Sequence, residues 1–121
     1  LIVHGFDGLD EITITDSTYV AELKDNSITE YQISPKDFGL NMGKLSEISA
    51  QSPDDSLQLI REAFSGDQSA VQDMIALNAG AALYLANVVN SIADGIELSF
   101  ELMNNGMAAN KLASYVRISN S

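Results

Sequence analysis

Two adjacent carboxylates, Asp10 and Glu11, are the residues of this sequence best suited to chemistry. They end a short loop that contains two glycines, Gly5 and Gly8. Neighbouring carboxylates can hold a Mg²⁺ ion that keeps several waters and also bridges the phosphates of a substrate. The sequence therefore offers Asp10 and Glu11 as candidate metal ligands.

The element that must position this pair is the unbroken apolar run of residues 1–3. Such a run predicts a strand buried on both faces of a parallel sheet. Gly5 and Gly8 let the backbone turn sharply and approach a ligand closely. The pair then lies just past the carboxyl end of the strand, where ligands bind in open α/β sheets. The alternative is that both carboxylates are solvated surface groups, as most acidic side chains are.

The single histidine, His4, lies at the end of the same strand. One histidine excludes a metal centre built on several imidazoles and gives little support to a Ser-His-Asp triad. Because no partner accompanies it, we expect a packed or hydrogen-bonded histidine in preference to a catalytic one. No glycine-rich phosphate-binding motif occurs either, so the sequence predicts no catalytic residue and no phosphate cradle.

The charge balance limits the classes of partner. Seventeen acidic residues against six basic ones give a net charge of −11, which argues against binding to nucleic acid or to an anionic membrane surface. The chain contains no cysteine, so it has neither a disulfide framework nor a thiolate nucleophile, and we expect a cytoplasmic protein. No apolar stretch approaches the length of a membrane span.

Strands are predicted in the first third of the chain after the acidic pair. Residues 12–15 alternate apolar and polar side chains, which predicts a half-buried strand. Residues 19–24 and 28–33 form a predicted hairpin around a short polar turn. In this hairpin we expect Tyr19, Ala21 and Leu23 to share the inner face with Tyr31 and Ile33, and Glu22, Lys24 and Glu30 to point to water.

Residues 44–52 are predicted as a loop that can include a short strand or turn, and helices are predicted for the rest of the chain. The expected starts are Ser52-Pro53, Asp67, Asn90-Ser91 and Met107. The second helix is apolar nearly all round through Val89, so we expect it to lie inside the fold. Gly80 in its middle costs about 1 kcal/mol relative to Ala and therefore indicates close packing against another element. In the last helix, Ala108, Leu112, Tyr115 and Val116 are expected to face inward.

The chain resembles a known family over nearly its whole length. Residues 3–11, which include the letters VHG and DGLDE, resemble a stretch of anthranilate phosphoribosyltransferase. Any one matching piece is a weak signal, but the ordered set is a strong one. The other matching segments are, in order, residues 20–25, 34–40 and 76–86, Gly106, and residues 111–112.

This resemblance implies a chemistry. The family transfers the 5-phosphoribosyl group from phosphoribosyl pyrophosphate to the amine of anthranilate, with release of pyrophosphate, in tryptophan biosynthesis. Mg²⁺ neutralises the negative charge that develops in this reaction, which contributes several kcal/mol of transition-state stabilisation. The family's Asp-Glu pair binds one of its Mg²⁺ ions, and Asp10 and Glu11 match that pair.

The resemblance also implies an incomplete site. Residues 1–121 correspond to the C-terminal portion of an α/β domain of the nucleoside phosphorylase/phosphoribosyltransferase type, with a parallel strand, an antiparallel hairpin and then four helices. The family's helical N-terminal domain, its G-T-G-G-D pyrophosphate loop and its K-H-G-N segment are not in the sequence, and Leu1 is no initiator. We therefore expect a half-site without turnover of its own, in a protein that forms a homodimer through the missing domain.

Three alternatives stay open. A pyrimidine nucleoside phosphorylase would share the fold, although the Gly-Leu-Asp-Glu match disfavours it. A non-enzymatic paralogue of the same fold is the second alternative. The third is an independent metal-binding module with Asp7, Asp10 and Glu11 as its ligands.

Overall fold

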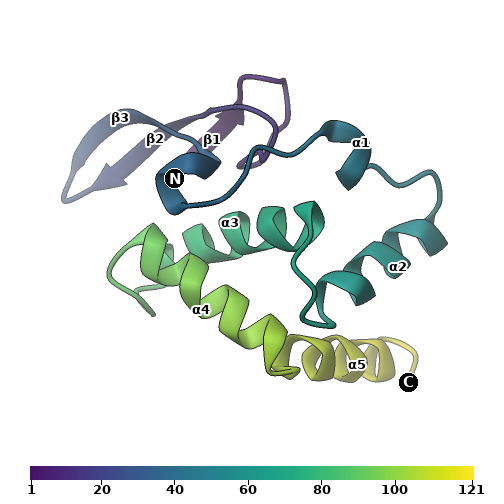
Figure 1. The fold of residues 1–121 in the computed structure, drawn as a ribbon. Coiled ribbons are helices and arrows are strands. Elements are labelled where there is room, and N and C mark those ends of the chain that lie inside the picture. Colours follow the sequence, from purple (N-terminus) through teal and green to yellow (C-terminus); the bar gives the residue numbers. More distant parts are fainter.

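A three-stranded antiparallel sheet opens the computed structural model, which describes all 121 residues (Figure 1). Its strands are β1 (Ile2–Gly5), β2 (Thr18–Lys24) and β3 (Ser27–Ile33), in the order β1-β2-β3. Asp25 and Asn26 alone connect β2 to β3, with φ values of 50° and 61°. Positive φ at both central positions is the geometry that a two-residue hairpin turn requires, and Asp and Asn tolerate it. The predicted hairpin is confirmed.

The setting of the first strand differs from the prediction. β1 pairs with β2 in antiparallel fashion and has no second neighbour, so it is an edge strand of this sheet. Ile2 is 76% exposed, and the prediction of a strand buried on both faces is therefore wrong for residues 1–121. An apolar run identifies a strand well, but burial on both faces depends on neighbours that the run itself does not specify.

The two faces of β2 are also the reverse of the prediction. Val20 is fully buried and lies opposite Tyr31, whereas Leu23 is 68% exposed. Glu22 lies on the inner face, where its carboxylate accepts hydrogen bonds from the hydroxyls of Tyr31 (2.9 Å) and Tyr84 (2.6 Å). Successive side chains of a strand point to opposite faces, so turning Glu22 inward also turns Val20 inward and Leu23 outward. The two tyrosine hydroxyls satisfy the inward carboxylate.

The inward position of the Glu22 carboxylate shifts its own pKa and that of Tyr31. The hydrogen bond from Tyr84 is the largest influence on Glu22 and, with that from Tyr31, lowers the pKa of its carboxyl. Burial, followed by the hydrogen bond to Glu22, raises the pKa of Tyr31 to about 12. Lys24 donates to the Tyr84 hydroxyl at 3.0 Å, so this group of side chains ties the hairpin to the helix that carries Tyr84.

No strand forms at residues 12–15, contrary to the prediction. Ile12, Thr13 and Ile14 are all buried, so the alternation of apolar and polar residues does not correspond to two faces. The N–H of Ile12 donates to Asn78 and that of Thr13 donates to Thr18 Oγ1, so both are bonded to side chains and not to a neighbouring strand. Side-chain oxygens thus accept the backbone hydrogen bonds that a neighbouring strand would otherwise accept.

Four long helices follow the sheet, as predicted, together with two shorter ones. Serine side chains cap three of the long helices, at Ser52, Ser69 and Ser91. Ser69, and not the predicted Asp67, begins the central helix, because its Oγ accepts from the N–H three residues later. Residues 44–52 contain a short helix where a loop was expected. The elements are η1 (Pro35–Phe38), α1 (Leu45–Ile48), α2 (Pro53–Ala63), α3 (Ala70–Leu85), α4 (Ile92–Asn104) and α5 (Met107–Ser119).

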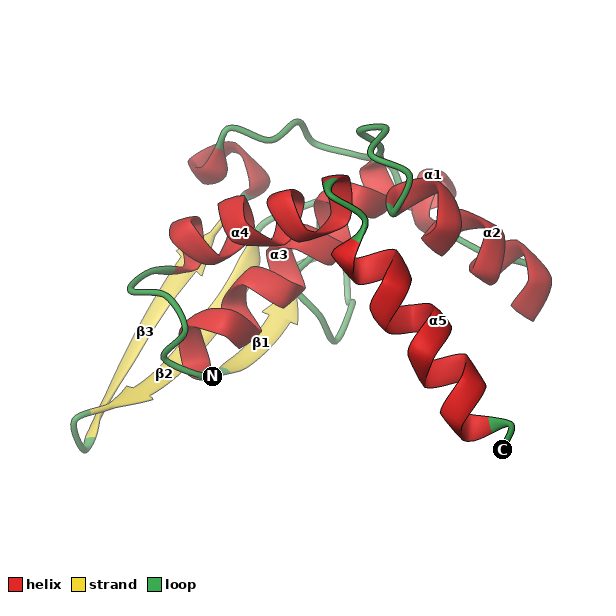
Figure 2. Cartoon of the chain, turned by 90° about the horizontal axis from the view of Figure 1, so that it is seen from below, coloured by secondary structure: helices red, strands yellow, loops and turns green.

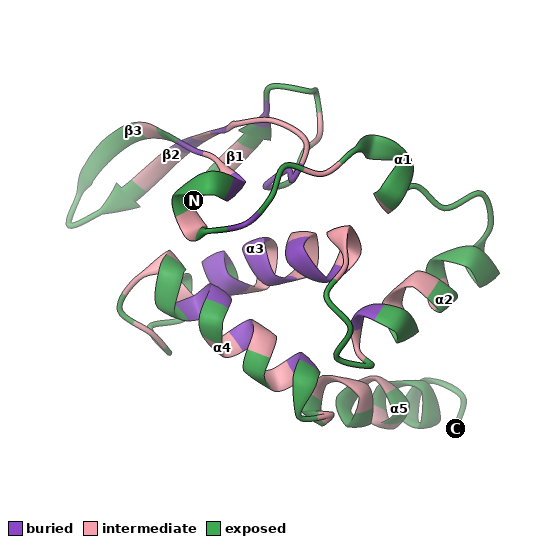
Figure 3. Ribbon diagram, in the orientation of Figure 1, coloured by how far each residue is buried: buried purple, intermediate pink, exposed green.

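Helix α3 lies between the sheet and α4, so it forms the middle layer of the fold (Figures 1 and 2). The buried residues gather along α3 and on the segments that face it (Figure 3). This arrangement confirms the prediction of an interior helix, although α3 ends at Leu85, before the predicted Val88 and Val89. The main core contains Ile12, Ile14, Val20, Ile33, Leu40, Ala76, Leu77, Ala81, Ile96 and Met103.

Two glycines allow α3 and α4 to cross with their backbones in contact. A Cβ on Gly80 would lie 2.6 Å from the backbone nitrogen of Ile96, and one on Gly95 would overlap the carbonyl of Gly80. Ordinary side chains do not approach so closely, so each position accepts only glycine while the helices keep this separation. The close packing predicted from Gly80 is therefore confirmed, and its partner is Gly95.

The outer helices leave apolar side chains uncovered. Tyr115 and Val116, predicted to face inward, are exposed, and α5 has no buried residue. Val116 and Leu112 line a groove of about 630 Å³ between α5 and α2.

None of the helices combines the length and the apolar character that a bilayer crossing requires.

We predict that Gly80→Ala destabilises the chain. Alanine would gain about 1 kcal/mol in helix propensity. The added methyl meets the backbone of α4, which cannot rotate away, so overpacking should cost about 3 kcal/mol and outweigh that gain. Urea denaturation followed by circular dichroism measures the difference. Ala82→Gly, at an exposed position of the same helix, calibrates the propensity effect alone. A more stable Gly80→Ala variant would contradict the crossing described here.

Candidate metal-binding site

Asp10 and Glu11 lie in the loop that follows β1. Both are exposed, and neither carboxylate accepts a hydrogen bond from the protein. Free carboxylate oxygens are the donors that a hard cation such as Mg²⁺ prefers, and two of them leave room for water and for substrate oxygens. The donor set therefore fits a Mg²⁺ ion that the protein holds through one face only.

Asp7, although exposed, organises this loop because both of its carboxylate oxygens accept hydrogen bonds from the loop itself. Its Oδ2 accepts hydrogen bonds from the hydroxyls of Thr13 (2.6 Å) and Thr15, and its Oδ1 accepts from the N–H of Leu9 at 3.1 Å. Loss of some hydration at the exposed Asp7 side chain is the largest single influence and raises the pKa of its carboxyl. The hydrogen bonds together outweigh it, so the net pKa lies below the ordinary value.

Glycine at position 5 makes room for that carboxylate. Gly5 is buried, and a Cβ there would overlap Oδ1 of Asp7 and lie 3.1 Å from Cγ2 of Thr13. The N–H of Gly5 donates to the carbonyl of Leu9 at 2.8 Å and closes the loop. Gly8, with φ of 95°, makes the sharp turn between Gly5 and Leu9. Both glycines thus serve the backbone turn that the sequence predicted.

Helix α3 holds the other end of the loop through Asn78, which sequence reasoning did not single out. The Asn78 amide accepts from the N–H of Ile12 and donates to the carbonyl of Ile12, at 2.9 Å each. Its nitrogen also donates to the carbonyl of Met74 at 3.0 Å. The available signal was an amide side chain in the middle of α3, between apolar neighbours on both sides, because a polar group placed there must find partners.

The single histidine does not take part in this site. His4 lies in β1 with an exposed side chain and without a hydrogen bond, so the expectation of a packed or hydrogen-bonded histidine is wrong. Nowhere in the chain do three His, Cys, Asp or Glu side chains gather as a metal-binding group. The structure therefore does not support an independent metal module with Asp7, Asp10 and Glu11 as ligands.

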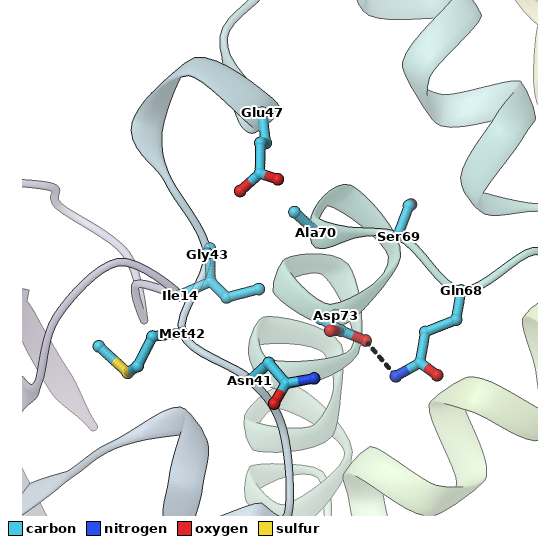
Figure 4. Close-up of a pocket in the computed structure, with 9 residues that line it drawn as sticks. All are labelled: Ile14, Asn41, Met42, Gly43, Glu47, Gln68, Ser69, Ala70 and Asp73. Atoms are coloured by element: carbon cyan, nitrogen blue, oxygen red, sulfur yellow. Dashed lines mark hydrogen bonds between the residues drawn. The ribbon is translucent and has the colours of Figure 1, made fainter.

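A second polar site, a hollow of about 300 Å³, lies between the start of α3 and the segment that leads into α1 (Figure 4). Asp73, only 6% exposed, lines it together with Glu47 and Ile14. Gln68 Nε2 donates to Asp73 Oδ1 at 3.4 Å, and burial raises the pKa of the Asp73 carboxyl. The hollow does not include the acidic pair, so its carboxylates do not extend the candidate site.

The chain is similar to known proteins over most of its length. Residues 1–109 match the family described as "Glycosyl transferase family, a/b domain". The anthranilate phosphoribosyltransferase of Vesicomyosocius okutanii is 44% identical over 117 residues, which are 97% of this chain and 34% of that protein. The chain thus spans about a third of the length of the curated relatives that it matches.

Solved structures resemble the chain as well. The anthranilate phosphoribosyltransferase of Thermus thermophilus superposes with a TM-score of 0.86 at 28% identity, covering 98% of this chain and 35% of that one. The enzyme from Saccharomyces cerevisiae in complex with PRPP and Mg superposes with a TM-score of 0.78 at 26% identity. That match covers 92% of this chain and 32% of the yeast chain.

We predict that Asp7→Asn lowers the free energy of unfolding at neutral pH, because the amide cannot accept as strongly from Thr13, Thr15 and Leu9. A depressed carboxyl pKa stabilises the folded chain above the unfolded-state value, near 3.8, and this contribution is lost as the pH falls through the lower folded-state pKa. The difference between the variant and the parent should therefore shrink below about pH 4.

Urea titrations at pH 7, 5 and 3 measure this dependence. Asp10→Asn is the matched control, because its carboxylate accepts no hydrogen bond, and its effect should stay within about 0.5 kcal/mol. A pH-independent loss in Asp7→Asn, or an equal loss in the control, would contradict the role given to Asp7.

Proposed function

This chain belongs to the glycosyl transferase family, a/b domain, and from that premise we propose that the complete protein is an anthranilate phosphoribosyltransferase. It would transfer the 5-phosphoribosyl group of phosphoribosyl pyrophosphate to the amine of anthranilate and release pyrophosphate, a step of tryptophan biosynthesis. The observation that carries the proposal is the exposed Asp10-Glu11 pair in the loop that follows β1, in a chain whose bacterial relatives carry that enzyme's name.

Residues 1–121 supply the C-terminal segment of the α/β domain in this proposal. They span about a third of their relatives, so the other parts of the active site would come from the remaining two thirds. These parts are the pyrophosphate-binding loop, the anthranilate pocket and the helical N-terminal domain. We propose that this helical domain forms a homodimer interface and that the enzyme works in the cytoplasm.

Asp10 and Glu11 would hold one Mg²⁺ ion and present it to the substrate. The yeast neighbour solved with PRPP and Mg supports this choice of ion. When bound, the ion supplies positive charge next to the pyrophosphate group as negative charge develops on it. The protein's own contribution is positional, because the loop backbone is fixed from Asp7 on one side and from Asn78 on the other.

Charge gives a second physical reason for a metal at this site. Phosphoribosyl pyrophosphate is a polyanion, and residues 1–121 carry a net charge of −11. Two exposed carboxylates repel such a substrate unless a divalent cation lies between them. The metal therefore turns an unfavourable surface into a binding surface, and substrate affinity should depend steeply on Mg²⁺.

We predict that Asp10→Asn combined with Glu11→Gln, in the complete enzyme, raises the Mg²⁺ concentration required for half-maximal rate and lowers the rate about 10²-fold or more. Removal of the ligands forfeits several kcal/mol of charge stabilisation, and each 1.36 kcal/mol is a factor of ten. Loss of anthranilate fluorescence in the presence of phosphoribosyl pyrophosphate measures the rate across a Mg²⁺ titration. Asp25→Asn, in the distant hairpin turn, is the control for the loss of one negative charge away from the site. An unchanged titration curve would refute the assignment.

The same fluorescence assay tests the proposed reaction itself. Residues 1–121 alone should give no turnover, whereas the complete protein should consume anthranilate. No activity of the complete protein under any Mg²⁺ concentration would overturn the proposal.

A further inference from the structure

We infer that Asn78 is a positioning residue for the Asp10-Glu11 pair, acting from α3 through the backbone of Ile12. This inference rests on the proposed function, because it gives the pair the task of holding Mg²⁺. Asn78 touches neither carboxylate. Its effect would pass through the peptide units on either side of the pair.

The amide of Asn78 is committed in one orientation. It accepts from the Ile12 N–H and donates to the Ile12 carbonyl, at 2.9 Å in each case, and its second N–H donates to the Met74 carbonyl at 3.0 Å. A flipped amide would place its NH₂ against the Ile12 N–H and its oxygen against two carbonyls. The three hydrogen bonds therefore fix the side chain, and α3 fixes its Cα.

This contact sets the peptide plane that follows Glu11. The Ile12 N–H belongs to the peptide unit that joins Glu11 to Ile12, and that unit is planar. An N–H held by Asn78 Oδ1 therefore also fixes the direction in which the carbonyl carbon of Glu11 leaves its Cα. The Ile12 side chain is 3% exposed, so the apolar core holds the same unit from the other side.

A second contact sets the peptide plane that precedes Asp10. The carbonyl of Leu9, which belongs to the peptide unit joining Leu9 to Asp10, accepts from the N–H of Gly5 at 2.8 Å. The N–H of Leu9 is bonded to Asp7 Oδ1 at 3.1 Å. The acidic pair thus lies between two fixed peptide units, and only the unit between Asp10 and Glu11 lacks a hydrogen bond of this kind.

The consequence is a rigid backbone that presents two free carboxylates. Both side chains are exposed and accept no hydrogen bond from the protein, so they keep their oxygens for a cation. A fixed backbone lowers the ordering that metal binding must impose on its ligands. Partners that orient metal ligands typically change metal affinity 10–100-fold when they are mutated. Loss of the Asn78 contact should therefore weaken metal binding without removing a ligand.

The test uses the complete enzyme with Asn78→Ala and with Asn78→Asp. The aspartate can still accept from the Ile12 N–H. It presents an oxygen to the carbonyls of Ile12 and Met74, so the variant keeps the side-chain shape of Asn78 and loses its two N–H donors. It also provides a measurement if the alanine variant does not fold. Tyr84→Phe is the matched control, because it removes a contact from the same helix to Glu22 on β2 and leaves the loop alone.

The readout is the affinity for Mn²⁺, a paramagnetic substitute for Mg²⁺, measured by electron paramagnetic resonance with phosphoribosyl pyrophosphate present. Both Asn78 variants should bind Mn²⁺ about tenfold more weakly or worse, following the effect expected of orienting partners. The Ile12 amide should also exchange its hydrogen faster. Tyr84→Phe should bind Mn²⁺ like the parent, even where its melting temperature falls.

Two outcomes separate this inference from the proposed function. Unchanged Mn²⁺ affinity in both Asn78 variants, with weakened affinity in Asp10→Asn, would overturn the positioning role and leave the metal assignment intact. Unchanged affinity in Asp10→Asn combined with Glu11→Gln would overturn the metal assignment and the inference with it. A Mn²⁺ loss in Tyr84→Phe equal to that of the Asn78 variants would also overturn the inference, because it would show a general effect of destabilising α3.

Discussion

The pairing of one side-chain amide with one backbone residue joins the two halves of this molecule. Asn78 in the middle of α3 bonds both polar groups of Ile12, which lies 66 positions earlier in the chain. Ile12 has no strand neighbour, so without this partner its N–H and carbonyl would be left unpaired next to the core, at a cost of roughly 1–3 kcal/mol for each group. The irregular segment after the acidic pair can remain irregular because α3 satisfies its backbone.

Helix α3 can hold Ile12 in place because α4 packs tightly against the opposite side of α3. Gly80 and Gly95 bring the backbones of α3 and α4 into contact, and α3 carries apolar side chains toward the sheet as well. A helix packed on both faces moves little, so a group attached to it is well placed to orient a loop. The hairpin is fastened to the same helix by Glu22, Tyr31 and Tyr84, although that contact lies apart from the acidic pair.

Acidic residues that are close in sequence have different roles at the candidate site. Asp7 gives its carboxylate to two threonine hydroxyls and one backbone N–H, which makes it part of the loop's own structure. Asp10 and Glu11 make no such bonds and remain available to a cation. Residues 1–121 carry a net charge of −11, so their own side chains repel anions and attract cations.

Sequence by itself determined the local features of this protein. The glycine loop and its acidic pair, the hairpin, the serine cap at Ser52 and the close packing at Gly80 each follow from a few neighbouring residues, and all are present in the structure, although the hairpin turn holds residues 25–26 and not the expected 25–27. Tertiary structure decided which face of β2 is buried, that residues 12–15 form no strand, and that Asn78 reaches Ile12. The physical reason is that Glu22 and Ile12 each find a hydrogen-bond partner more than sixty residues away, on α3. Local periodicity carries no information about partners so distant, and the free energy of satisfying a buried polar group outweighs the preference that periodicity expresses.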